Sequence, residues 1–200
     1  GKLTMDFQSS RLKDVIEENR KQFNPVARSR GVEFIIDIDE GCPDMFCSDM
    51  HRLSQILRNL LSNAFKFTHQ GHVKLSVCAQ QGQSHDSPGA KALCFAVEDT
   101  GIGVPKKVQK DIFEAFQQAD GSTSRAYGGS GLGLTISREL AQLLGGDIEL
   151  TSEEGKGSIF KLTIPEQQSE NVEEQGNAQT GLIDQTPLTI AQGSTEKDSN

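Results

Sequence analysis

Two asparagines one helical turn apart stand beside the most regular apolar segment of the sequence. Asn59 and Asn63 lie with Gln55 and Lys66 on one flank of this segment, about 100° from the middle of the apolar face of the helix it predicts. Neutral amide oxygens suit a hard cation such as Mg2+ whose other ligands are phosphates and water, and a lysine beside them suits the phosphates. The flank predicts a magnesium and phosphate site, and the alternative interpretation is an ordinary solvated helix face.

Asp99 stands at the end of the apolar segment LCFAVED and is followed by Gly101 and Gly103 in VEDTGIGVP. A carboxylate at a strand end can accept a hydrogen bond from the exocyclic amine of adenine, whereas guanine presents an acceptor oxygen there. The two glycines allow the backbone to approach a flat ring closely. The segment predicts an adenine-binding site, with a simple Asp-Thr-Gly turn as the alternative.

The segment YGGSGLGL has four glycines between Gly128 and Gly133, directly before an amphipathic segment. Four glycines in place of alanines forgo roughly 2–4 kcal/mol of ordering entropy. A glycine-rich loop that leads into a helix can bind phosphate with its backbone amides, and the alternative is a plain turn. The sequence matches neither the GxxxxGK motif with Ser or Thr nor the GxGxxG motif, which excludes the two familiar nucleotide loops.

The segment before these glycines, DIFEAFQQADGSTSRA, combines an aromatic patch with polar residues. Phe113 and Phe116 are expected to anchor it to the core while the rest opens and closes as a lid. Arg125 is the only positive charge between Lys110 and Arg138, which makes it the natural phosphate contact of such a lid. The alternative is a disordered loop with two ordinary core phenylalanines.

The hydrophobic pattern also predicts the elements that must position these residues. The predicted order is helix, strand, helix, two strands, a short broken helix, a glycine-rich loop with a helix, and two strands, over residues 10–30, 31–40, 49–67, 72–79, 93–99, 105–116, 127–144, 147–153 and 158–165. Strands in adjacent pairs predict an α+β fold, a two-layer α/β sandwich with a mixed sheet covered on one face by helices. A doubly wound nucleotide-binding fold is not expected.

Local signals refine these boundaries. Pro25 should kink or divide the first helix, and Ser48 or Asp49 should cap the second. QQGQSHDSPGAK should form a loop, and the pair of glycines after Leu144 should end the last helix.

Composition limits the class of protein. The chain has 200 residues and a net charge of −8, which argues against a general nucleic-acid or membrane-surface binder. Residues 166–200 contain seven acidic residues, one lysine and no aromatic residue, so a disordered acidic tail or linker is predicted there. The four cysteines form no CxxC pair, and free reduced thiols without a zinc site are expected.

Four segments in this order resemble the boxes of the ATP-binding catalytic domain of sensor histidine kinases. QILRNLLSNAFKFT is similar to the N box, VEDTGIGVP to the first glycine box, IFEAFQQAD to the phenylalanine box and YGGSGLGL to the second glycine box. The resemblance covers about residues 1–165. It implies the Bergerat fold, which these kinases share with gyrase, Hsp90 and MutL ATPases.

The resemblance assigns roles to the residues discussed above. Asn63, together with Asn59, would be the magnesium ligand, and Lys66 and Arg125 would hold the phosphates of ATP. These four are also the expected catalytic residues, since phosphoryl transfer depends mainly on positioning and charge neutralisation.

The resemblance also implies how the rest of ATP is held. Phe67 would pack near the adenine, where many relatives have tyrosine, and Asp99 would accept from its amine. Gly101 and Gly103 would shape that pocket. The second glycine box would form the hinge of the lid and offer backbone amides to the phosphates through Gly129, Ser130, Gly131, Leu132 and Gly133.

The implied reaction is transfer of the γ-phosphoryl group of ATP to a histidine on a separate dimerisation domain. Among the four histidines only His85 has the acidic neighbour typical of such an acceptor, and Pro88 and Gly89 oppose a helix there. The fragment is therefore expected to be inactive in isolation. The alternatives are a degenerate ATP-binding regulatory or scaffolding module and an ATP hydrolase, although no glutamate stands among the polar N-box positions.

The resemblance divides the chain into three parts: residues 1–10 as the end of the dimerisation helices, residues 11–165 as the catalytic domain and residues 166–200 as a linker. The second glycine box and the helix after it are most similar to those of hybrid kinases. A receiver domain or response regulator is therefore the expected partner, besides ATP and the dimerisation domain of a homodimeric parent. A cytoplasmic location is expected, with the cytoplasmic part of a membrane-bound sensor kinase as the alternative. No nucleic-acid partner and no direct membrane contact of this fragment are expected.

Overall fold

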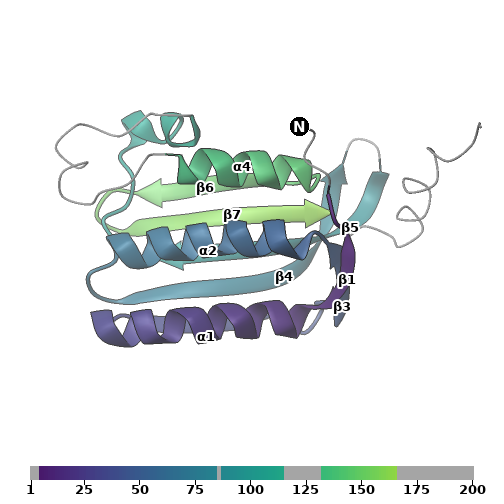
Figure 1. Ribbon diagram of the computed structural model, residues 1–200. Helices are drawn as coiled ribbons and strands as arrows, with labels where there is room; N and C mark the ends of the chain where they lie inside the picture. The colour runs from purple at the N-terminus through teal and green to yellow at the C-terminus, as the bar shows by residue number, and fades with distance from the viewer. Residues whose placement is uncertain (1–4, 85–86, 115–131, 166–200) are drawn as a thin grey trace, which may run out of the picture.

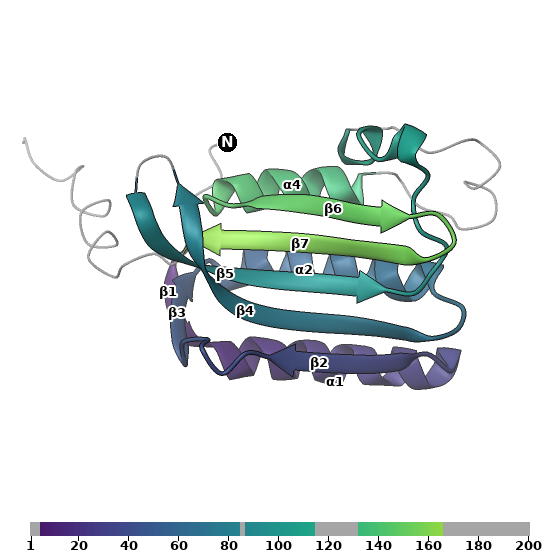
Figure 2. The ribbon, with the colours of Figure 1, turned by 180° about the vertical axis from the view of Figure 1, so that it is seen from behind.

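The computed structural model describes residues 5–84, 87–114 and 132–165. These residues form two layers, a five-stranded sheet and three α-helices that cover one of its faces (Figure 1). The helices are α1 (Leu12–Arg30), α2 (Met50–Phe67) and α4 (Gly133–Leu143). α2 lies between α1 and α4, and Figure 2 shows the sheet from its other face with the helices behind it.

The sheet is mixed. Its order is β2-β4-β5-β7-β6, in which β2 runs parallel to β4 and every other neighbouring pair is antiparallel. The strands are β2 (Glu33–Ile38), β4 (His72–Ser84), β5 (Ser87–Asp99), β6 (Asp147–Glu153) and β7 (Gly157–Pro165). The predicted α+β sandwich with a mixed sheet covered on one face is confirmed.

The core lies between the sheet and the helices, and α2 is its centre. Five α2 side chains have no exposed surface: Leu53, Ile56, Leu57, Leu60 and Leu61. They belong to one apolar cluster with Leu75 of β4 and Phe95 of β5. Because full burial of each such side chain contributes about 1.5–3 kcal/mol, this face fixes the rotation of α2 and therefore the direction of its polar flank.

The ends of the helices follow the local signals. Of the two predicted caps of α2, Asp49 is the N-cap, and its Oδ1 accepts a 3.0 Å hydrogen bond from the Arg52 amide. α4 ends before Gly145, which has φ +77°. α1, however, continues through Pro25, so the predicted division of this helix is wrong. Pro25 is exposed between the buried Phe23 and Ala27, and the packing of its neighbours holds the helix together.

The β4–β5 hairpin is longer than expected. Pairing continues to Ser84 opposite Ser87, with a register shift between Gln81 and Gln83, so most of the predicted loop is strand. β7 pairs with β5 only as far as Pro165 opposite Ala92. Beyond that point β5 pairs with β4 alone among the described residues, so Pro88 lies in an edge strand, where proline is tolerated.

A small antiparallel sheet of β1 (Gln8–Arg11) and β3 (Met45–Ser48) was not predicted from the sequence. The predicted broken helix is confirmed as two short 3-10 turns, η1 (Lys106–Val108) and η2 (Asp111–Phe113). All four cysteines are free, as expected. In the part of the chain that the structure describes, no helix has the length and apolar character needed to cross a membrane.

Candidate nucleotide-binding site

Asp99 is the last residue of β5 and is only 6% exposed. Its Oδ1 accepts a 2.8 Å hydrogen bond from the Gly101 amide. Burial raises the pKa of this carboxyl above its ordinary value, against the opposing effect of backbone amide hydrogen bonds from Gly101 and Ser158. A buried acceptor held by the backbone is suited to a specific donor such as an aromatic amine.

The first glycine box passes tightly between two other parts of the chain. A Cβ on Gly101 would stand 2.5 Å from the carbonyl oxygen of Phe67 and 2.8 Å from Asp99 Oδ1. Gly103 has φ +67°, and its Cβ would overlap the carbonyl of Glu153. Both glycines are therefore required by contacts within the protein. Their predicted place beside the adenine ring stays a prediction.

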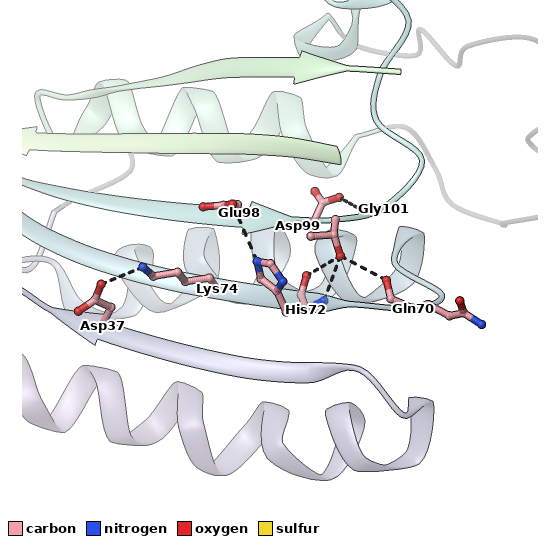
Figure 3. A network of polar contacts seen from close by, with 8 residues as sticks. Asp37, Gln70, His72, Lys74, Glu98, Asp99 and Gly101 are labelled. Carbon is pink, nitrogen blue, oxygen red and sulfur yellow. Dashed lines mark hydrogen bonds and ion pairs between the residues drawn. The ribbon is translucent and has the colours of Figure 1, made fainter. Parts of the chain in front are cut away.

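Thr100 ties the strand end to the turn that follows α2 through contacts with Gln70 and His72, which Figure 3 labels. Its amide donates to the His72 carbonyl at 3.2 Å, and its Oγ1 accepts from the His72 amide at 3.0 Å and contacts the Gln70 carbonyl at 3.2 Å. The side chain of Glu98 points to the face of the sheet opposite to that of Asp99, and it forms an ion pair of 3.9 Å with His72 (Figure 3). The position of Asp99 is thus fixed by backbone pairing on both sides.

The C-terminal end of α2 adjoins this strand end. The Ile102 amide donates to the carbonyl of Phe67 at 3.4 Å, and Lys66 Nζ lies 5.0 Å from the centre of the Phe67 ring. Arg30 of α1 donates from Nη1 to the carbonyl of Phe65 at 2.8 Å. Arg30 was not predicted, because nothing local in the sequence marks it as a partner of a helix end.

The predicted metal ligands lie on the flank of α2 that faces α4. Asn59 and Asn63 are half-buried, and Asn59 Nδ2 donates to Ser137 Oγ at 2.9 Å. The alternative of a plain solvated helix face therefore does not hold at Asn59. Ser137 was also missed, since a serine in the middle of a helix carries no distinctive pattern.

The N-terminus of α4 closes this side of the site. Leu132 is the N-cap residue, and a Cβ on Gly133 would stand 2.6 Å from Asn59 Oδ1. The end of the second glycine box is thus brought against the N box. Other residues predicted for the lid and its loop lie outside the described residues: Phe116, Arg125, Gly129, Ser130 and Gly131.

Phe113 packs on the core directly before the residues predicted to form a lid, as expected. Its ring lies edge-on to Phe160 of β7, with centroids 6.4 Å apart, and the Arg138 guanidinium lies 5.0 Å from it. Arg138 in turn makes two hydrogen bonds to Asp147, of 3.0 and 3.2 Å. This stack joins η2, α4 and the sheet at the end of the site.

The residues present fit a magnesium-bound nucleotide. The described residues hold no group of three His, Cys, Asp or Glu side chains that could bind a metal by itself. Asn59 Oδ1 accepts no hydrogen bond from any described residue, and Asn63 makes none through its side chain. Two surface pockets lie at the other end of α2, around Asp49 and around Met45, and neither includes a predicted site residue.

The chain matches one family model over residues 48–168, described as histidine kinase-, DNA gyrase B-, and HSP90-like ATPase. It belongs to this family. The predicted membership of the ATP-binding domains of histidine kinases is thereby confirmed. The four sequence boxes named in the sequence analysis all lie within residues 48–168.

Sensor proteins are among its curated relatives. The chain is 40% identical over 165 residues to the sensory/regulatory protein RpfC of Xanthomonas campestris, which is 82% of this chain and 22% of that protein. It is 38% identical over 165 residues to the autoinducer 2 sensor kinase/phosphatase LuxQ of Vibrio cholerae, covering 82% and 19%. It is 40% identical over 169 residues to the circadian input-output histidine kinase CikA of Synechococcus elongatus, covering 84% and 21%. The chain thus spans about a fifth of the length of these relatives.

Solved structures agree with this ATPase family. The full-length ShkA structure, a complex with AMPPNP, is 30% identical with a TM-score of 0.71 and covers 84% of this chain and 33% of ShkA. The catalytic domain of the histidine kinase ThkA in a nucleotide-free form is 25% identical with a TM-score of 0.65, covering 81% and 99%. The latter match extends over a whole histidine kinase catalytic domain.

Proposed function

We propose that this chain is the ATP-binding catalytic domain of a sensor histidine kinase and transfers the γ-phosphoryl group of ATP to a histidine on a dimerisation domain. The observation that carries the proposal is the meeting of Asp99 with the end of α2. Asp99 is buried, and Gly101 and Ile102 directly after it contact the carbonyl of Phe67 at the end of the helix that bears Asn59 and Asn63. There the carboxylate would accept from a purine amine. The similarity to sensor kinases supports the same activity.

Asp99 would select the base. Its carboxylate accepts from the amine of adenine and would face the carbonyl oxygen of guanine without a proton between them. Phe67 lies next to the first glycine box and would pack against the ring. Lys66, at the end of the same helix, would contribute positive charge to the phosphates together with Arg125.

Asn59 and Asn63 would hold Mg2+ through their amide oxygens, with the remaining ligands from phosphates and water. When bound, the ion supplies neutralisation of the triphosphate charge. The chain contributes positioning: α2 holds the amides, and the loop around Gly129, Ser130, Gly131 and Leu132 would hold the phosphates by backbone amides. The acceptor imidazole then displaces ADP from the γ-phosphorus.

Hydrolysis of ATP as the main activity is less well supported. A water nucleophile needs a general base in reach, and the polar flank of α2 offers Gln55, Asn59 and Asn63 without an acid. The regulatory alternative, an ATP-binding module without phosphotransfer, keeps the same site and differs only in the reaction. Labelling of a histidine separates the two.

The arrangement of the parent protein is part of the proposal. Residues 11–165 would be the catalytic domain, residues 1–10 the connection from the dimerisation helices and residues 166–200 a linker towards a receiver domain. β1 (Gln8–Arg11) runs across the first of these boundaries and pairs with β3, so residues 8–10 pack with the catalytic domain. A homodimeric parent, a response regulator as partner and a cytoplasmic location follow from this function.

Calorimetry with ATP and GTP, each with and without Mg2+, tests the binding function. We expect ATP to bind, Mg2+ to strengthen binding, and GTP to bind at least 10-fold more weakly. Phosphotransfer is then tested by adding a dimerisation domain from a 40% identical relative and following acid-labile label from γ-labelled ATP. Equal affinity for the two nucleotides would remove the role of Asp99, and binding without labelling would favour the regulatory module.

A further inference from the structure

We propose that Ser137 is a positioning residue that orients the carboxamide of Asn59 for Mg2+. This inference rests on the proposed function, since it concerns the metal of the bound nucleotide. It assigns a task to a buried residue of α4 outside the four sequence boxes. The contact that suggests it is the 2.9 Å hydrogen bond from Asn59 Nδ2 to Ser137 Oγ.

Ser137 is well placed to hold a neighbour still. Ser137 is only 2% exposed. It lies in the middle of α4, between the N-terminal turn of this helix and the buried Leu140, and α4 packs on α2. The hydroxyl is fixed by its helix and accepts from an amide nitrogen. Since an asparagine side chain presents a donor at one end and an acceptor at the other, binding Nδ2 decides where Oδ1 points.

Gly133 confines the other end of the carboxamide. A Cβ at this position would stand 2.6 Å from Asn59 Oδ1 and 3.2 Å from its Cγ, so the amide group occupies the space that a side chain would need. Oδ1 accepts no hydrogen bond from a described residue. The amide is therefore held at its nitrogen and presents its oxygen beside the first turn of α4.

Such an arrangement favours metal binding by preorganisation. An unrestrained asparagine rotates between orientations that present oxygen or nitrogen, and only one of them suits a cation. Fixing the productive orientation before the ligand arrives means that binding no longer bears the entropic cost of ordering the amide. We therefore expect Ser137 to affect the part of nucleotide affinity that depends on Mg2+ and to leave the metal-free part unchanged.

Thr135 provides a matched control on the same helix. Its hydroxyl is buried and has no hydrogen-bond partner among the described residues. Thr135→Val keeps the shape of the side chain and removes a hydroxyl that makes no hydrogen bond to a described site residue. Ser137→Ala removes a hydroxyl of the same kind that is bonded to Asn59.

The test measures ATP affinity by calorimetry with Mg2+ and with a chelator, for the unchanged chain, Ser137→Ala, Asn59→Ala, the double variant and Thr135→Val. We expect Ser137→Ala to reduce the strengthening by Mg2+ roughly 3- to 10-fold, the effect of one lost hydrogen bond, with metal-free affinity unchanged. The double variant should match Asn59→Ala, and Thr135→Val should match the unchanged chain. An equal loss with and without metal, or an additive loss in the double variant, overturns the inference.

A second measurement needs no ligand. In the nucleotide-free protein, the side-chain NH2 signals of Asn59 in an NMR spectrum are identified by their loss in Asn59→Ala. We expect Ser137→Ala to move them to positions of a free amide and Thr135→Val to leave them in place. Unchanged Asn59 signals in Ser137→Ala would overturn the inference while leaving the proposed function intact. Failure of the unchanged chain to bind ATP would instead remove both. Should Ser137→Ala fold poorly, Ser137→Cys, which keeps only a weak acceptor, replaces it with the same expected direction.

Discussion

The carbonyl oxygen of Phe67 lies 2.5 Å from the point where a Cβ of Gly101 would stand, closer than real Cβ contacts permit. The end of α2 and the first glycine box therefore meet backbone to backbone. This contact sets how far Asp99 stands from the helix that bears the asparagines. It also makes the spacing of the site sensitive to a single methyl group.

Gly101→Ala should lower the free energy of unfolding by about 2–3 kcal/mol and abolish measurable ATP binding, because the added methyl group must displace backbone atoms on α2. Chemical denaturation and calorimetry measure the two effects. Gly31→Ala is the control: Gly31 has φ +65° but open space around its Cβ, so only about 1 kcal/mol of backbone strain is expected. A Gly101→Ala variant as stable as Gly31→Ala would contradict the tight contact.

Asp99→Asn should weaken ATP binding by about 10- to 100-fold, because an amide that replaces a buried carboxylate loses a charge-assisted hydrogen bond. The fold should remain stable, since the variant removes a costly buried charge. Glu98→Gln is the matched control, one residue away on the other face of the sheet. Similar losses in the two variants would show that Asp99 does not contact the base.

Protein stability should depend on pH through Asp99. Burial raises its pKa in the folded state, so the folded protein binds a proton more readily than the unfolded chain. Its destabilising contribution is then fully present above the raised pKa and disappears as the pH falls below the ordinary value for aspartate. We expect the free energy of unfolding of the unchanged chain to rise relative to that of Asp99→Asn as the pH is lowered from neutral to acidic, as measured by chemical denaturation. A difference that is constant with pH would contradict the raised pKa.

Arg30→Ala should destabilise the chain by about 1 kcal/mol, because Arg30 satisfies the carbonyl of Phe65 in the last turn of α2. ATP affinity should fall as well, because Lys66 and Phe67, the proposed contacts of the phosphates and the adenine, directly follow Phe65 in α2. Arg28→Ala is the control, from the same last turn of α1, since the exposed Arg28 side chain makes no hydrogen bond or ion pair to a described residue. Thermal unfolding and calorimetry on both variants measure the effect. Equal behaviour of the two would show that the hydrogen bond contributes nothing.

Much of the fold was readable from local order. The apolar spacing of α2, the cap at Asp49 and the glycine after α4 depend on neighbouring residues, and their predictions are confirmed. The errors lie where distant residues decide. Pro25 stays within α1 because Phe23 and Ala27 are buried in the core, and the hairpin beyond residue 80 is extended because its two strands pair with each other.

By itself, the sequence determined the family and the types of residue at the candidate site, because boxes of fixed spacing on helices and loops are local properties. Only the tertiary structure determines which glycines leave no room for a side chain and which distant residues hold the site residues in place. Gly133 faces Asn59, Gly101 faces Phe67, and Ser137 and Arg30 support groups far away in the chain. The physical reason is that close packing joins segments by their shapes in space, and periodicity along one segment carries no information about its neighbour.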